Sequence, residues 1–326
     1  MRQGDDGFRS GSIDRRPGEA NRAAVAAPTR ANFVMLFALG LIWGGAFMGI
    51  ELALRGYGPA TVAAGRLTLG ALALMAFTAL SAPNGPAPAR FHIPWIIAIG
   101  FFGTGLPFLL LAWGQTVVSS GFAGVAMAMV ALFVLPLAHF LVPGDQMTKR
   151  KASGFALGFA GVAVLLGPGL LVSGWSGTEV LGRLACLGAA CCYAIASICT
   201  RLSPPIDSVA LARWQLIIGA ACILPVALIV DGVPRDLPIW PSLALLALAL
   251  LPTALGAWMR VRIIRTAGPS FMSTVSFQVP VWAVVLGIVF LDEDVSLSLF
   301  AALGLILAGM GISQWSTIRK FFANSH

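Results

Sequence analysis

The few side chains of this sequence that could do acid–base or electrostatic chemistry inside a membrane lie in long apolar segments. They are Glu51, Arg66, His139 and Arg213. Glu51 is a carboxylate within an apolar run, and a carboxyl group at membrane depth could carry a coupling proton. Arg55 follows one helical turn later, so an ordinary ion pair between these two side chains is the competing interpretation.

The other three ionisable candidates also have a structural alternative. Arg66 and Arg213 would each cost roughly 2.5–3.5 kcal/mol at the centre of a membrane helix on insertion scales. They could gate a pathway or contact a substrate, or they could reach the interface and bond to backbone carbonyls. His139 could titrate near neutral pH, but no acid lies near it in sequence, which favours a packing role.

A second group of candidates is uncharged and is typical of a small-molecule site, where apolar walls surround a few polar groups. Thr274, Gln278 and Trp282 recur every four residues and share one face of a helix, while Pro280 frees a backbone carbonyl nearby. Tryptophans at helix ends, such as Trp113, more often mark the membrane interface. The predicted binding and pathway residues are Trp43, Gln115, Tyr193, Gln278, Pro280 and Trp282.

Several other chemistries lack the residues that they require. The five cysteines have no C-x-x-C spacing and no neighbouring histidine, so we expect packing residues and neither a metal site nor a cofactor. The only lysines are Lys149, Lys151 and Lys320; none lies inside a helix, as a retinal Schiff base needs, and none follows a glycine, as a P-loop needs. A membrane enzyme would need paired catalytic groups, whereas Asp145 and Asp207 lie far apart. We therefore predict that the protein is not an enzyme.

The helices that must position these residues follow from the composition. Apolar residues make up 58% of the chain, charged residues 10%, and the mean hydropathy is +0.88, which a water-soluble domain could not bury. Since a spanning helix needs ~20 apolar residues, the sequence predicts an all-α integral membrane protein. Its ten predicted transmembrane helices are residues 33–54, 60–81, 93–114, 121–142, 152–171, 180–200, 208–230, 241–262, 271–291 and 296–316.

The distribution of basic residues predicts the orientation. Sixteen of the 21 lysines and arginines share one side: they lie in the two terminal segments, in alternate loops and at the end of the predicted helix 241–262. By the positive-inside rule, both termini are cytoplasmic in a multi-pass protein of the cell inner (plasma) membrane. The net charge of +8 therefore requires no nucleic-acid partner. Residues 1–31 are predicted to be a disordered basic cytoplasmic tail that is not a cleaved signal peptide.

An internal repeat divides the rest of the chain into residues 32–172 and 179–316, followed by a C-terminal cytoplasmic tail at 317–326. Residues 62–66 (VAAGR) match 209–213 (VALAR) at an offset of 147, and Trp43 faces Tyr193 at an offset of 150. Each half holds five predicted helices, an odd number, so the second half enters the membrane from the opposite side. Two inverted halves around a central cavity can open it alternately to each side, as a carrier requires.

Further motifs extend this pattern over roughly residues 33–316. They are residues 41–47 (LIWGGAF), Arg66, residues 119–123 (SSGFA), and residues 252–254, 267–270, 279–282, 291–293 and 305–309. In these motifs the chain resembles the EamA-type ten-helix proteins of the drug/metabolite transporter superfamily. The resemblance implies movement of a small metabolite across the membrane, often as efflux, through a cavity bounded by helices 1–4 and 6–9, with helices 5 and 10 more peripheral. Two departures are Asp292 in place of a glycine, and Leu132-Phe133 where a proline is usual, with Pro136 further on.

The sequence therefore predicts a carrier that moves a small metabolite, such as an amino acid, by alternating access. Its expected partners are the small-molecule substrate and the lipid bilayer. The alternatives are a polytopic membrane enzyme and a channel-like facilitator. Small-residue spacings, such as Gly124-x3-Ala128 and Gly154-x3-Gly158, indicate close helix packing and could also line a homodimer contact.

Overall fold

The computed structural model describes residues 28–81, 90–167, 177–294 and 296–323, and all the regular structure in these ranges is helical. The predicted N-terminal tail, apart from its last residues, lies outside them. Nine helical segments in the described ranges are long and apolar enough to cross a membrane. They are Arg30–Leu54, Pro59–Ala79, Arg90–Gly114, Ser120–Leu141, Thr178–Leu202, Ser208–Val230, Ile239–Ala267, Phe271–Leu291 and Leu297–Trp315.

The tenth predicted helix is present as α7 (Lys149–Leu166), which has 18 residues and begins with three basic ones. Because of these three charges, α7 is not among the nine apolar segments. Part of its predicted C-terminal turn lies outside the described residues. The last helix, α15 (Leu297–Ala323), continues beyond its predicted end at residue 316. The predicted all-α membrane fold is confirmed.

Four predicted helices are interrupted rather than continuous. One segment consists of α3 (Ile93–Gly100), a π-helical turn (Phe101–Gly105) and α4 (Leu106–Gly114). Another consists of α11 (Ile239–Leu248), a π-helical segment (Ala249–Leu255) and α12 (Gly256–Ala267). Pro107 and Pro252 lack the N–H that a continuous helix would use there. The other two pairs are α5 (Ser120–Met127) with α6 (Met129–Leu141), and α13 (Pro269–Ser273) with α14 (Val275–Leu291).

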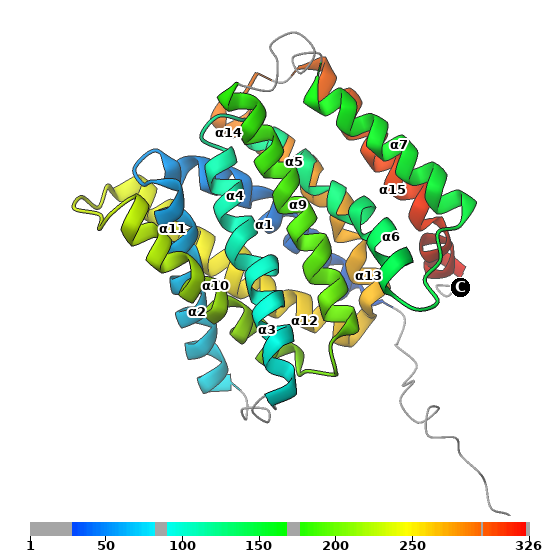
Figure 1. The fold of residues 1–326 in the computed structure, drawn as a ribbon, viewed down its shortest axis with the longest axis horizontal. Coiled ribbons are helices and arrows are strands. Elements are labelled where there is room, and N and C mark those ends of the chain that lie inside the picture. Colours follow the sequence, from blue (N-terminus) through cyan, green and yellow to red (C-terminus); the bar gives the residue numbers. More distant parts are fainter. Residues whose placement is uncertain (1–27, 82–89, 168–176, 295, 324–326) are drawn as a thin grey trace, which may run out of the picture.

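The remaining helices are α1 (Arg30–Leu54), α2 (Pro59–Ser81), α9 (Thr178–Leu202) and α10 (Ser208–Val230). In the middle of the bundle, α1 packs against α14, α11 and α12, while α9 packs against α4, α5 and α6 (Figure 1). The pair α2 and α10 contact each other closely. Figure 1 shows α7 and α15 side by side at one edge of the bundle.

Close backbone contact between α7 and α15 depends on glycine. A Cβ atom added to Gly309 would lie 2.5 Å from the carbonyl oxygen of Gly154 and 2.7 Å from the nitrogen of Gly158. Likewise, a Cβ on Gly124 would lie 2.1 Å from that of Ala283. These contacts agree with the packing interpretation of the small-residue spacings.

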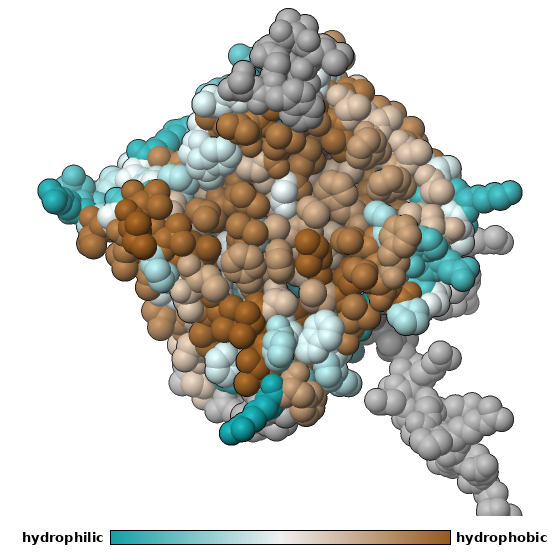
Figure 2. Space-filling view, viewed as in Figure 1, coloured by the Kyte–Doolittle hydropathy of each residue, from teal (hydrophilic) through white to brown (hydrophobic). Residues whose placement is uncertain are grey.

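Hydrophobic side chains cover the broad middle of the face in Figure 2, and hydrophilic residues gather towards its margins. Many large apolar side chains are exposed, including Phe140 at 80% and Trp240 at 80%. Such a surface is suited to lipid rather than water.

Candidate functional site

The helices define two ends of the bundle. We call the end where α1 begins, at Arg30, the proximal end, and the end where α1 finishes, at Leu54, the distal end. The polar interactions of the described residues fall into a central cluster and a set of contacts at each end.

The central cluster is organised around Arg66 on α2, which is only 7% exposed. Its Nε–H donates to Thr253 Oγ1 at 2.9 Å, and its guanidinium carbon lies 3.9 Å from the centroid of the Phe108 ring. Thr253 is in the π-helical segment, and its hydroxyl donates to the carbonyl of Leu248 at 2.8 Å. An arginine stacked on an aromatic ring and held through Nε has a fixed orientation.

Trp43 on α1 reaches the same segment. Its Nε1–H donates to the carbonyl oxygen of Pro252 at 3.1 Å, next to Thr253. Tyr193 on α9 packs against two hydrophobic clusters and lies close enough to Arg66 for the two groups to interact electrostatically. The structure therefore brings together three predicted site residues, Trp43, Arg66 and Tyr193.

Phe108 and Thr253 are members of this cluster that were not predicted from the sequence. Thr253 had a usable signal, because a proline within a long apolar run predicts a broken helix whose neighbours are free to bind side chains. Phe108 follows Pro107 in the same way, but one phenylalanine among 20 gives no local signal.

Gln278, Pro280 and Trp282 lie on α14, which packs along α1. The side chain of Gln278 is set against Gly40, and Trp282 is set against Gly44. The Trp282 ring meets Phe37 edge to face, with centroids 5.4 Å apart. The buried Oε1 atom of Gln278 has no hydrogen-bond partner within the described part of the chain. Pro280 is buried.

The distal end is tied together by two carboxylates. Glu293, which follows α14, accepts hydrogen bonds from the backbone N–H groups of Ser120 at 2.7 Å and Gly121 at 3.1 Å, at the start of α5. Asp231 accepts from the N–H of Thr61 at 2.7 Å, near the start of α2. Carboxylates suit helix N-termini because N–H groups and the helix dipole favour negative charge there. From the sequence, Glu293 was only part of the 291–293 motif of the family resemblance, with no predicted contact.

Two predicted site residues lie near this end. Gln115 is 3% exposed, and neither polar atom of its amide has a partner in the described residues. Glu51 is partly buried on α1, where the positive charge of Arg55 attracts its carboxylate and the carboxylate of Glu293 repels it more weakly. Within the described ranges no ion pair joins Glu51 to Arg55, so the simple surface pair considered for them is not formed.

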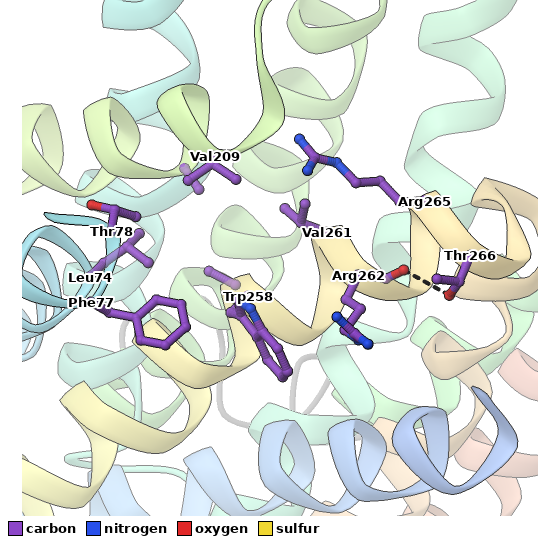
Figure 3. Close-up of a pocket in the computed structure, with 11 residues that line it drawn as sticks. Leu74, Phe77, Thr78, Val209, Trp258, Val261, Arg262, Arg265 and Thr266 are labelled. Atoms are coloured by element: carbon purple, nitrogen blue, oxygen red, sulfur yellow. Dashed lines mark hydrogen bonds between the residues drawn. The ribbon is translucent and has the colours of Figure 1, made fainter. Parts of the chain in front are cut away.

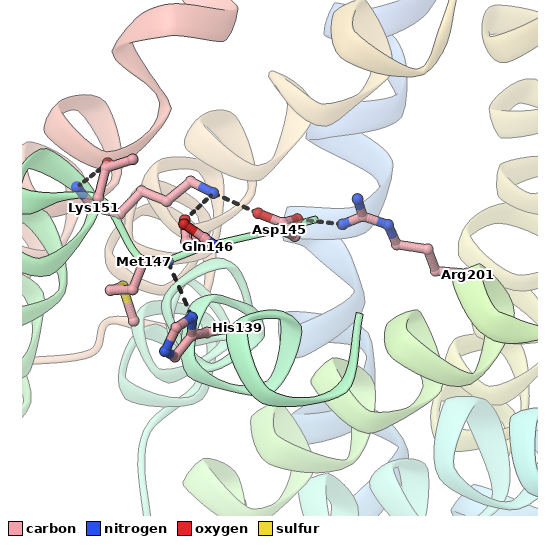
Figure 4. Close-up of polar contacts among 7 residues, drawn as sticks. His139, Asp145, Gln146, Met147, Lys151 and Arg201 are labelled. Atoms are coloured by element: carbon pink, nitrogen blue, oxygen red, sulfur yellow. Dashed lines mark hydrogen bonds and ion pairs between the residues drawn. The ribbon is translucent and has the colours of Figure 1, made fainter. Parts of the chain in front are cut away.

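At the proximal end, Figure 4 shows Asp145 between Lys151 and Arg201. Its carboxylate oxygens lie 2.5 Å from each of these two side chains. The hydrogen bond from Lys151, followed by that from Arg201, lowers the pKa of Asp145 from its ordinary value. His139 is exposed, and its Nδ1 accepts from the backbone N–H of Met147 at 3.2 Å. Arg213 is half-buried near the start of α10 and has an interaction of its own.

A pocket of about 300 Å³ opens towards the proximal end between α2, α10 and α12 (Figure 3). Its wall is mainly apolar, with Trp258 among the lining residues, and two arginines give it positive charge. The Arg262 guanidinium carbon lies 5.7 Å from the centroid of the Trp258 ring, while Arg265 pairs with Asp207 at 3.0 Å. Thr253 in the central cluster is five residues before Trp258, so this pocket lies about 1.5 helical turns from the cluster.

The profile of the EamA-like transporter family matches this sequence twice, at residues 31–167 and 180–314. The uncharacterized transporter YoaV of Bacillus subtilis is 24% identical over 287 residues, which cover 86% of this chain and 95% of YoaV. The uncharacterized inner membrane transporter YedA of Escherichia coli K12 is 28% identical over 280 residues, or 84% of this chain and 88% of YedA.

A protein of Streptantibioticus cattleyicolor, named "Probable terminal-alkyne amino-acid exporter", is 27% identical over 216 residues, which cover 66% of this chain and 70% of that protein. Among solved structures, one crystal structure matches with a TM-score of 0.59 at 20% identity, covering 88% of this chain and 98% of that chain. This last likeness concerns the fold alone.

Proposed function

This chain belongs to the EamA-like transporter family, and from that premise we propose that it exports a small metabolite, an amino acid or a similar molecule, by alternating access. The chain is a membrane transporter and not an enzyme. The proposal concerns the substrate class, the direction and the mechanism.

The central cluster is the observation that carries this proposal. Trp43, Arg66 and Phe108 belong to the first stretch that matches the family, and Tyr193 and Thr253 belong to the second. Each stretch contains five membrane-length helical segments, which supports an inverted repeat. A site shared by two inverted halves can be exposed to each side in turn. The name of the Streptantibioticus relative supports an amino-acid substrate.

We assign the proximal end to the cytoplasm and the distal end to the outside of the inner membrane. The positive-inside distribution of the basic residues supports this orientation. The pocket at Trp258 would then open inward, while Glu293 and Asp231 tie the outer end. This combination fits a carrier that receives its substrate from the cytoplasm. Gln115, Gln278 and Trp282 remain proposed pathway residues.

Counterflow in proteoliposomes tests the carrier mechanism. Vesicles containing purified protein and loaded with one unlabelled amino acid should take up the same labelled amino acid faster than unloaded vesicles. The acceleration requires a binding site that carries unlabelled substrate out and returns with labelled substrate bound. A carrier has such a site, and an open pore does not. Protein-free vesicles are the control. Single-channel currents without acceleration would instead show a channel-like facilitator.

A further inference from the structure

The guanidinium group of Arg66 is a buried positive charge without a negative partner among the residues that the structure describes. No carboxylate among the described residues forms an ion pair with it, and its exposed fraction is 7%. Arginine does not lose its proton under ordinary conditions, so the charge persists in this apolar surrounding. Buried charges in proteins are otherwise paired or bound to ligands.

The hydrogen bond that Arg66 makes within the described residues uses only the Nε side of its guanidinium group. Nε–H is bound to Thr253, and no hydrogen bond from Nη1 or Nη2 reaches any described residue. The hydroxyl of Tyr193 likewise makes no hydrogen bond in the part of the chain that the structure describes. Arg66 stacks on the Phe108 ring, and Tyr193 packs against the hydrophobic cluster that contains Phe108, so unused donors from each half of the chain gather around this residue.

We propose that Arg66 and the Tyr193 hydroxyl bind a carboxylate group of the transported substrate, with Trp43 contributing an apolar wall. The two Nη atoms present parallel donors that match the two oxygens of a carboxylate. The substrate is thereby restricted to molecules that carry a carboxylate, and the incoming group neutralises the buried charge. This inference rests on the proposed carrier function and narrows its substrate class.

A purely structural role for Arg66 gives a different expectation. Loss of its bond to Thr253 and its contact with Phe108 would lower the stability of the folded protein. It would weaken the binding of every substrate to a similar extent, because Arg66 would not contact any particular chemical group of the substrate. Discrimination between a carboxylate and its neutral carboxamide separates the two roles.

The experiment compares the amino acids with their carboxamides, and includes polyamines and sugars as compounds without a carboxylate. Melting temperature and counterflow are measured for wild type, Arg66→Gln, Arg66→Lys and Tyr193→Phe. Arg90→Gln is the control for loss of an exposed arginine, and Tyr57→Phe is the control at the only other tyrosine. Charged hydrogen bonds justify an expected wild-type preference of roughly tenfold or more for the carboxylate.

The proposal is supported if Arg66→Gln abolishes this preference, Arg66→Lys restores part of it, Tyr193→Phe reduces it, and both controls keep it. It is overturned if the wild type binds the carboxamide as well as the amino acid, a test that needs no variant to fold. Transport of a polyamine or sugar alone, with no amino acid transported, would overturn the carboxylate site and leave a carrier. Absence of counterflow for every compound would overturn the carrier function and this inference with it.

Discussion

Pro252 has no backbone N–H, so it cannot make the hydrogen bond that the carbonyl of Leu248 would accept in a continuous helix. The hydroxyl of Thr253 donates to that carbonyl instead, and its oxygen accepts the Nε–H of Arg66. The carbonyl of Pro252 itself receives the indole N–H of Trp43. The break at Pro252 thus provides polar groups that bind side chains of two helices, α1 and α2. At membrane depth such groups must find hydrogen-bond partners within the protein.

Asp292 has a backbone conformation that is unfavourable for a residue with a side chain. It ends α14 in the left-handed conformation, with φ 51° and ψ 36°, just before Glu293. Glycine adopts this conformation without the steric cost of a Cβ atom. The sequence departs here from the glycine expected by resemblance.

We expect Asp292→Gly to raise the free energy of unfolding by about 0.5–1 kcal/mol, because it removes this strain. Thermal unfolding in detergent measures the change. Asp294→Gly in the same exposed loop is the control and should give no increase, since Asp294 does not have a positive φ. A lower melting temperature for Asp292→Gly would mean that the aspartate side chain stabilises the turn.

At the scale of elements, helices that cross the membrane are held together where small residues let backbones meet. Lipid is as apolar as the helix surfaces, so apolar area alone does not drive them together. The most extensive contact of this kind joins α7 and α15 through Gly154, Gly158 and Gly309. The hydrogen bonds of Glu293 add a polar connection, which joins the end of α14 to the start of α5.

Two glycines of α15 allow a matched test of this packing. A Cβ on Gly309 meets backbone atoms of α7 within 3 Å, whereas a Cβ on Gly304 meets nothing within 4 Å. Gly309→Ala should lower the free energy of unfolding by roughly 1–3 kcal/mol through overpacking. Gly304→Ala should be neutral or stabilise by up to about 1 kcal/mol, because alanine favours a helix. Equal melting temperatures for the two variants would contradict the close approach of α7 and α15.

At the scale of the whole molecule, charge is separated between the ends. The basic cluster at the start of α7 lies at the proximal end, and the acidic residues Asp292, Glu293 and Asp294 lie at the distal end. The proposed orientation puts the basic end in the cytoplasm. It also sets the direction in which the pocket at Trp258 opens.

Cysteine labelling tests this orientation in intact cells. A cysteine at Thr178, exposed at the distal start of α9, should react with an impermeant maleimide in an otherwise cysteine-free protein. One at Ser153, exposed near the proximal start of α7, should react only after the membrane is permeabilised. The opposite pattern would reverse the sides and exclude the proposed cytoplasmic termini.

The sequence by itself determined the membrane class and the helical segments, and α10 has the predicted bounds of residues 208–230. This was possible because hydrophobicity is a local property and because a chain in lipid must satisfy its backbone hydrogen bonds within each helix. Only the tertiary structure decided which side chains meet. Arg66 contacts Thr253, 187 residues away, and Glu293 reaches Ser120 across 173 residues, while the neighbours Glu51 and Arg55 do not pair. Such contacts depend on how the helices pack against one another, which is a property of the assembled bundle rather than of any one segment.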